Sequence, residues 1–126
     1  MNIAADTSAM IAYFKGEASS KNIEILRRAI DQELLFLPPI VAAEILSFPR
    51  ITPKVEQAIR RIPYLEITPG FCVRVGLSRS VILKKGFKAR IADAMIAQCC
   101  IDNNVPLITL DKDFRHFKKY CDLQLV

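Results

Sequence analysis

The chain has 126 residues, a mass of 14.2 kDa and a formal net charge of +5. This length predicts a single domain, residues 1–126, that buries about two-thirds of its unfolded surface. Apolar residues make up 52% of the chain and charged residues 25%, a balance that excludes an intrinsically disordered protein. No apolar run approaches the roughly 20 residues of a membrane-spanning helix, and the first residues lack the basic start of a signal peptide. We therefore expect a cytoplasmic protein without membrane contact.

Short apolar segments alternate with helical patterns along the chain. Residues 2–6 read as a buried strand that ends at Asp6, and residues 34–37 as a second strand. Three more short strands are expected, at residues 64–68, 105–110 and 122–126. Helical patterns cover residues 7–16, 19–33, 52–62, 70–85, 90–104 and 112–120, and another helix begins at the Pro38–Pro39 pair. This alternation predicts an α/β sandwich, in which helices cover both faces of a parallel sheet.

Local residue types predict where some of these helices begin and end. Thr7 or Ser8 is expected to cap the first helix, and Gly86 to stop the helix over residues 70–85.

The cysteines and the single histidine disfavour zinc sites and imidazole-based catalysis. The four cysteines lack paired C-x-x-C spacing, so we expect them to be small core residues: Cys72, Cys99, Cys100 and Cys121. His116 is the single histidine of the chain, so a site that needs several imidazoles is not expected. We expect His116 on the surface.

One carboxylate stands out within the apolar segment PPIVAAEILSF, residues 38–48. In a helix, Glu44 shares its face with Ile40, Val41, Ser47 and Phe48. An ionised carboxylate is expensive to bury alone, so Glu44 must be protonated, paired with a partner or bound to a cation.

Three aspartates are expected to join Glu44 at one edge of the sheet. Ligands of parallel sheets sit beyond the carboxyl ends of the strands. Asp6 ends the first strand, Asp111 follows the strand at residues 105–110, and Asp93 lies near the start of the preceding helix. Each aspartate alone could be a helix cap or a turn residue, but those roles leave Glu44 unexplained.

A divalent cation would explain all four acids, because carboxylates on one rim repel each other unless a positive charge lies between them. Oxygen ligands without histidine or cysteine point to Mg²⁺ or Mn²⁺.

Three segments, in this order, carry a resemblance to a known family: AADTSAMIAYFKGE, AAEIL and RIADAMIAQCCIDNNVPLITLDKDF. They resemble PIN-domain ribonucleases, and most of all the VapC toxin subunits of VapBC toxin–antitoxin pairs. The third segment is the most specific, with an aspartate at a helix start, a strand and then Thr-x-Asp-x-Asp-Phe. The resemblance implies a three-layer α/β fold with a mostly parallel five-stranded sheet.

The resemblance also implies the functional residues and the partners. Its catalytic, metal-binding acids fall on Asp6, Glu44, Asp93 and Asp111, with Asp113 as a further metal ligand. Hydroxyl groups that orient the carboxylates or water fall on Thr7, Ser8 and Thr109. It implies hydrolysis of RNA, with Mg²⁺ or Mn²⁺ as cofactor, in a homodimer whose early helices line a groove for a cognate antitoxin.

The basic residues support a nucleic-acid substrate. Without the five acids of the candidate site, eight acidic residues remain against eighteen basic ones, a net charge of +10. Candidate RNA contacts flank the acids in sequence: Lys84, Lys85, Lys88, Arg90, Lys112 and Arg115, with Lys118 and Lys119 beyond them. Aromatic residues are only 8% and tryptophan is absent, so the composition predicts no stacking platform for bases.

Two other functions remain open from the sequence. A PIN-like module could bind RNA without cutting it, although acids stand at all four quartet positions. A magnesium-dependent phosphohydrolase or phospho-accepting domain would also use an acidic rim, but AADTSA lacks a D-x-D motif after the first strand.

Overall fold

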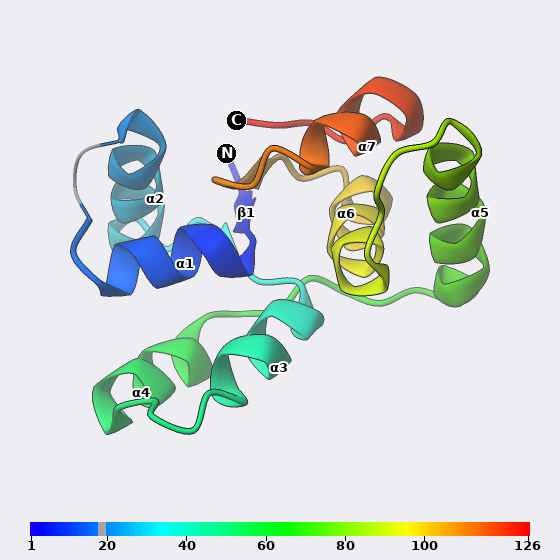
Figure 1. Ribbon diagram of the computed structural model, residues 1–126. Coiled ribbons are helices and arrows are strands. Elements are labelled where there is room, and N and C mark those ends of the chain that lie inside the picture. The colour runs from blue at the N-terminus through cyan, green and yellow to red at the C-terminus, as the bar shows by residue number, and fades with distance from the viewer. Residues whose placement is uncertain (18–19) are drawn as a thin grey trace.

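The structure is a computed structural model that describes residues 1–17 and 20–126 (Figure 1). Three short strands form a parallel sheet in the order β2–β1–β3. The strands are β1 (Ile3–Ala5), β2 (Leu35–Phe36) and β3 (Leu107–Ile108). The helices are α1 (Thr7–Phe14), α2 (Lys21–Asp31), α3 (Pro39–Leu46), α4 (Pro53–Arg61), α5 (Phe71–Lys84), α6 (Ile91–Asn103) and α7 (Phe114–Cys121).

The central strand β1 is buried on both faces. Figure 1 shows α1 and α2 on one side of β1, and α5 and α6 on the other. Ala4 and Ala5 are completely buried, because helices cover the faces of a parallel sheet and leave its middle strand no contact with water. The predicted α/β class with a parallel sheet is confirmed.

The expected number of five strands is wrong. The segments at residues 64–68 and 122–126 each contribute a single parallel bridge, Tyr64 with Leu37 and Leu125 with Leu107. In each segment only one side chain, Leu65 or Leu123, is buried. One buried side chain gives an edge segment little packing to extend its ladder, so the pairing stops after one bridge.

Helix termini follow local capping chemistry with one correction. The cap of α1 is Asp6 rather than Thr7 or Ser8, because its Oδ1 accepts a hydrogen bond from the Ala9 amide at 2.9 Å. The predicted stop of α5 is confirmed, since Gly86 adopts a left-handed conformation with φ of +83°. The pattern over residues 19–33 corresponds to α2, and its first predicted residue, Ser19, lies outside the described residues.

The expectation of buried cysteines holds for only part of the set. Cys99 and Cys100 are buried in α6, but Cys121 is half-buried and Cys72 is exposed at the start of α5. Cys72 is exposed because Phe71 and Val75 occupy the buried face of that helix. Among residues 1–17 and 20–126, no helix combines the length and the apolar composition that crossing a membrane requires.

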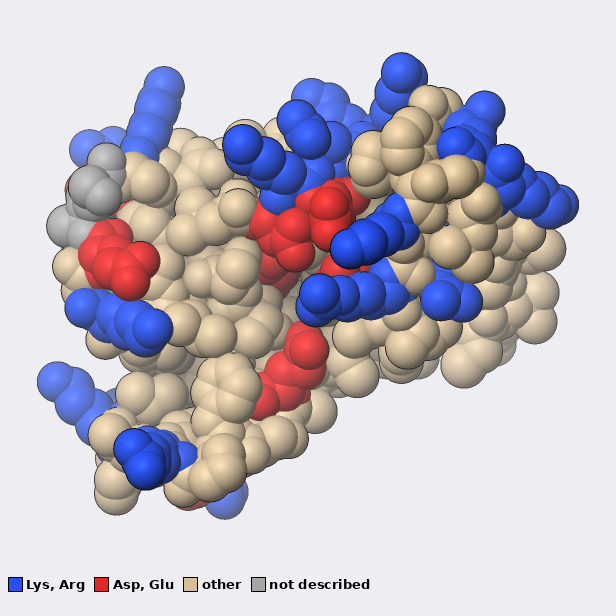
Figure 2. All heavy atoms as spheres, in the orientation of Figure 1, with Lys and Arg blue, Asp and Glu red and all other residues tan. Residues whose placement is uncertain are grey.

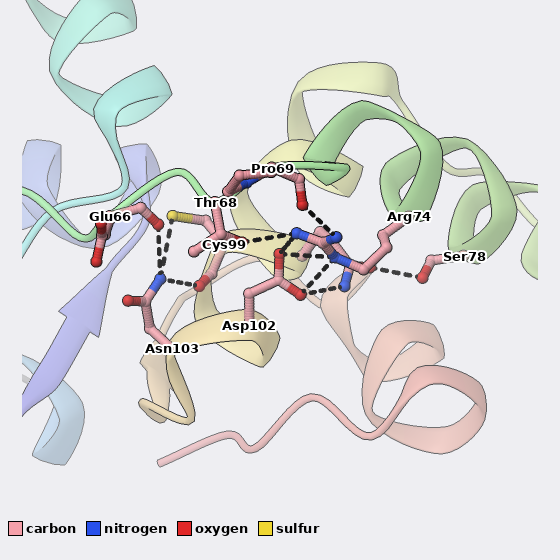
Figure 3. Close-up of polar contacts among 9 residues, drawn as sticks. Glu66, Thr68, Pro69, Arg74, Ser78, Cys99, Asp102 and Asn103 are labelled. Carbon is pink, nitrogen blue, oxygen red and sulfur yellow. Dashed lines mark hydrogen bonds and ion pairs between the residues drawn. The ribbon is translucent and has the colours of Figure 1, made fainter.

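Arg74 joins α5 to α6 (Figure 3). Its guanidinium donates to both carboxylate oxygens of Asp102 at 2.8–3.1 Å, to Thr68 Oγ1 at 2.7 Å and to the Pro69 carbonyl at 2.9 Å. Gln98 Nε2 also donates to Asp102, at 2.8 Å. This network fixes α5 against α6 and ties the loop before α5 to both helices.

The Asp102 carboxylate stabilises the fold in a pH-dependent way. Its partial burial would raise its pKa, but hydrogen bonds from Arg74 and Gln98 and the charge of Arg74 together lower the pKa below its usual value. A lowered pKa means that the ionised form favours the folded state. The stabilisation is therefore fully present above the unfolded pKa, about 3.9, and is lost as the pH falls through the lower pKa of the folded protein.

We predict that Asp102→Asn lowers the free energy of unfolding at pH 7 by about 1 kcal/mol, which is less than a buried hydrogen bond to a charged group contributes, because Arg74 is partly exposed. Urea unfolding followed by circular dichroism at pH 7 and pH 3 measures the difference. It should shrink at pH 3, because the carboxyl of the unfolded chain is mostly protonated there and part of the stabilisation is lost. Asp31→Asn, at an exposed position that ends α2, is the control. An equal loss at both pH values would contradict the assignment.

Candidate functional site

The carboxyl ends of β1 and β3 meet at one edge of the sheet. Asp6 follows β1 and Thr109 follows β3, and the Asp6 amide donates to the Ile108 carbonyl at 3.1 Å. Thr109 Oγ1 donates to Asp6 Oδ2 at 2.6 Å, so residues 103 positions apart touch through their side chains. The predicted location of Asp6 beyond the strand ends follows from this parallel pairing.

Asp6 is a buried carboxylate, 3% exposed, and its oxygens are hydrogen-bonded. The Ser8 hydroxyl lies 2.8 and 2.9 Å from its two oxygens, and the Ala9 amide and Thr109 hydroxyl complete the set. Burial raises the pKa of Asp6, the three hydrogen-bonding groups oppose that rise, and the charge of Asp111 adds to it. The net shift is upward, as expected for a carboxylate kept out of water beside another acid.

Glu44 has a direct partner. It lies on α3, and its Oε1 accepts a hydrogen bond from Thr7 Oγ1 at 2.7 Å. The side chain is only half-buried, and Phe48 on the same face is 43% exposed. The surroundings of Glu44 are thus more open than its sequence neighbours suggested. Its partner Thr7 directly follows Asp6 in the chain.

Asp111 and Asp113 lie in the turn between β3 and α7. The Asp111 amide donates to Thr109 Oγ1, and the Asp113 amide donates to Asp111 Oδ1, each at 2.9 Å. Asp113 occupies the cap position of α7, and both side chains are half-buried. Thr109 therefore contacts Asp6 through its side chain and positions the backbone that carries Asp111.

Asp93 lies close enough to the other three acids for their charges to raise its pKa. It lies in the first turn of α6 and is half-buried. Burial and the negative charges of Asp111, Glu44 and Asp6 raise its pKa to about 6, against the opposing charge of Arg90. The structure therefore brings Asp6, Glu44 and Asp111 within electrostatic reach of Asp93, from separate parts of the chain.

The donor set suits a hard divalent cation, because it offers carboxylate and hydroxyl oxygens without nitrogen or sulfur. In the part of the chain that the structure describes, no three acids, histidines or cysteines are arranged closely enough to hold an ion as they stand. Besides burial, the charges of Asp111, Glu44 and Asp6 raise the pKa of Asp93, and a cation would relieve that repulsion. The residues fit such an ion in chemistry and in charge.

Basic side chains border the acids. Figure 2 shows acidic side chains near the middle of one face with lysine and arginine side chains beside them. The six residues expected to contact RNA are all exposed: Lys84, Lys85, Lys88, Arg90, Lys112 and Arg115. Arg90 is the cap residue of α6, three positions before Asp93. This surface can attract a phosphate backbone to the edge of the acidic cluster.

An aromatic stack also lies on the protein, although the composition did not predict one. Phe87 packs on His116 with ring centroids 4.2 Å apart, and Tyr120 lies 6.3 Å from Phe87. His116 is thus half-buried rather than a free surface residue. Phe87 is 29 positions before His116, so sequence spacing could not predict that the two rings stack. The sequence feature that could have drawn attention to Phe87 is its position among lysines.

A groove of about 1090 Å³ lies away from the acids, between α1, α2 and α4. Its wall includes Tyr13 and Phe14, which contact each other edge to face with centroids 5.3 Å apart. Three basic residues, Arg27, Lys54 and Arg61, also line it, together with the acidic Glu33. The groove is therefore partly apolar with a predominantly basic border.

The family model of the PIN domain matches residues 3–120. Among solved structures, the chain is similar to VapBC2 of Rickettsia felis bound to a promoter DNA fragment, with a TM-score of 0.75 and 20% identity over 100% of this chain and 98% of that one. It is similar to VapBC-1 of nontypeable Haemophilus influenzae, with a TM-score of 0.75 and 25% identity over 100% and 97%. DNA-bound VapBC of Salmonella typhimurium gives a TM-score of 0.70 and 16% identity over 100% and 97%.

These structural relatives are VapC toxin subunits of VapBC complexes. The expected resemblance to PIN domains and to these toxin subunits is confirmed. A sequence comparison with proteins of curated function finds no match.

We predict that Asp93→Asn stabilises the folded protein at pH 7.5 in a chelating buffer. Because the folded pKa is raised to about 6, ionisation of Asp93 opposes folding. The penalty is absent below the unfolded pKa, grows as the pH rises toward 6 and is complete above it. The gain should be about 1 kcal/mol, below the full value of the shift because solvent screens a half-exposed group.

Urea unfolding at pH 4 and pH 7.5 tests this, with Asp31→Asn again as the control. The two proteins should be equally stable at pH 4 and differ at pH 7.5. A variant that is less stable than wild type at pH 7.5 would show that Asp93 is a structural residue rather than a strained one.

Proposed function

Because this chain belongs to the PIN-domain family, whose members are generally divalent-metal-dependent nucleases, we propose that it is a metal-dependent endoribonuclease and the toxin of a toxin–antitoxin pair. One observation carries the nuclease proposal. Four carboxylates from separate parts of the chain gather at the carboxyl edge of the sheet, with hydroxyl groups hydrogen-bonded to them. If each acid were only a helix cap or a turn residue, nothing would require the four to lie near one another.

The proposed cofactor is Mg²⁺ or Mn²⁺, held by Asp6, Glu44, Asp93 and Asp111, with Asp113 as a further ligand. When bound, such an ion supplies a Lewis acid that polarises the phosphodiester and lowers the pKa of an attacking water. The same four acids are the proposed catalytic residues.

The hydroxyl residues have a defined role in this proposal. Ser8 and Thr109 hold the Asp6 carboxylate in one orientation, and Thr7 does the same for Glu44. A ligand that is held in place loses less freedom when it binds an ion or a water molecule. We therefore assign Thr7, Ser8 and Thr109 as positioning residues.

The proposed substrate is RNA, and the basic border is its proposed binding surface. The net charge of +10 outside the candidate site attracts a polyanion. Binding that depends on Lys84, Lys85, Lys88, Arg90, Lys112 and Arg115 should weaken steeply as salt concentration rises, because each phosphate contact releases counterions.

We predict that the purified protein cleaves RNA with Mg²⁺ or Mn²⁺ and not with a chelator, and that Asp93→Asn lowers the rate about a hundredfold or more. Gel analysis of a labelled transcript measures both effects. Asp102→Asn is a matched control, because it removes an aspartate from the same helix on the side that faces α5.

The same assay separates the alternatives. Full activity of Asp93→Asn would defeat the assigned site. Binding of RNA without cleavage under any metal condition would leave a non-catalytic module, and hydrolysis of a phosphatase substrate instead of RNA would favour a phosphohydrolase. Mapping the 5′ ends of the products would identify the cleaved sequence.

The proposed partner is a cognate antitoxin that occupies the groove between α1, α2 and α4. The similar VapBC structures are complexes of a toxin with its antitoxin. The groove has aromatic side chains in its wall and three basic residues, so it suits a helix with an apolar face and acidic flanks.

We also propose that the protein is a homodimer, which light scattering on the purified protein would test.

We predict that Ala58→Arg weakens antitoxin binding at least about tenfold while RNA cleavage is retained, because Ala58 lines the groove and an arginine would fill it with a long, charged side chain. Inhibition of cleavage by the product of the adjacent reading frame measures the effect. Gln57→Arg, on the exposed face of α4, adds the same charge and should leave inhibition unchanged. Equal inhibition of Ala58→Arg would place the antitoxin elsewhere.

A further inference from the structure

The aromatic stack of Phe87, His116 and Tyr120 joins two segments that also carry site residues. Phe87 stands in the loop between α5 and α6, three positions before Arg90. His116 lies in the first turn of α7, where its amide donates to the Asp113 carbonyl at 3.3 Å. Phe87 is thus six positions before Asp93 along one segment, and His116 is three positions after Asp113 along the other.

The Phe87 ring stacks on α7 and is still partly exposed to solvent. The Phe87 and His116 rings are nearly parallel, with an angle of 12° between their planes, and Tyr120 is inclined by 22°. His116 and Tyr120 are four positions apart on α7, so their rings rise from the same side of that helix. Both rings therefore approach Phe87 from α7, and the Phe87 side chain remains 40% exposed. An exposed aromatic ring backed by a second parallel ring is a rigid surface for a planar ligand.

The charges around the stack specify the kind of planar ligand. The Lys85 and Lys119 ammonium groups lie 4.7 and 5.4 Å from the centre of the Tyr120 ring. Exposed Lys84 and Lys88 flank Phe87 in sequence. Cations beside a stacking surface fit a nucleobase with its attached phosphates, since the base takes the ring face and the phosphates take the ammonium groups.

We propose that Phe87, backed by His116, is a stacking site for one unpaired base of the RNA substrate, beside the acidic cluster. This inference rests on the proposed function, and it adds a preference for single-stranded RNA. A base inside a duplex is stacked between its neighbours and cannot lie on Phe87. The phosphates next to the stacked base would contact the lysines around the stack.

The test uses a fluorescein-labelled single-stranded RNA of mixed sequence, and the same strand annealed into a duplex. The protein carries Asp93→Asn to prevent cleavage. Phe87→Leu keeps an apolar side chain against α7 but removes the ring face. We expect it to weaken binding of the single strand about tenfold and to leave duplex binding unchanged. Equal affinity for the single strand, or the same loss for both RNAs, would overturn the proposal.

Phe87→Trp keeps the assignment testable if Phe87→Leu folds poorly. The chain has no tryptophan, so the fluorescence of this variant comes from position 87 alone. Stacking of a base should quench it when the single-stranded RNA is added and not when the duplex is added, with affinity close to that of the parent protein. Binding without quenching would show that the base lies elsewhere. Quenching by an antitoxin peptide instead of RNA would assign the stack to protein binding and overturn the proposal.

Failure of this inference differs from failure of the proposed function. A protein that cleaves RNA but shows neither effect at position 87 is a nuclease without this stacking site. A protein that shows both effects but never cleaves RNA with Asp93 intact is a single-strand binder, and only the proposed activity is then lost.

Discussion

The hydroxyl of Thr109 holds together the part of the molecule on which the candidate site depends. It donates to Asp6 and accepts from the amide of Asp111, and so connects the ends of two parallel strands. Asp6 is buried beside other acids, and both conditions oppose its ionisation. Hydrogen bonds from Ser8, Thr109 and the Ala9 amide offset part of that cost, which is how a carboxylate can remain at this position.

The location of the acids could be predicted because it follows from local pattern and topology. Apolar runs that end at Asp6 and before Asp111 indicate strands, and parallel strands bring their carboxyl ends to one edge. Asp93 was placed by the start of a strongly apolar helix. Glu44 was recognised as unusual because no capping or helical ion pair explained it, and its partner, Thr7, lies 37 positions away. Sequence pattern could indicate that a partner was needed without identifying it.

The features that could not be predicted depend on the packing of individual side chains. Residues 64–68 and 122–126 have strand-like sequences, but each buries one side chain and forms one bridge. Asp6 rather than Thr7 caps α1, because both hydroxyls beside it hydrogen-bond to carboxylates. The contact of Phe87 with His116 requires α7 to pack against the loop that follows α5, and no periodicity within either segment encodes that contact.

The acidic cluster and the basic residues around it have opposite charges, so they are suited to different tasks: the acids to catalysis and the basic residues to binding of RNA. An acidic cluster repels a phosphate backbone, so affinity for RNA must come from groups outside it. Surface lysines act over only about 10 Å at ordinary ionic strength, which limits useful attraction to basic residues close to the path of the strand. These residues attract any polyanion, whereas an aromatic face distinguishes an unpaired base from a paired one. The loop before α6 contributes Arg90 to the border and Phe87 to the stack, and leads directly to Asp93. An RNA strand bound to that loop would therefore be positioned by the same segment that positions Asp93.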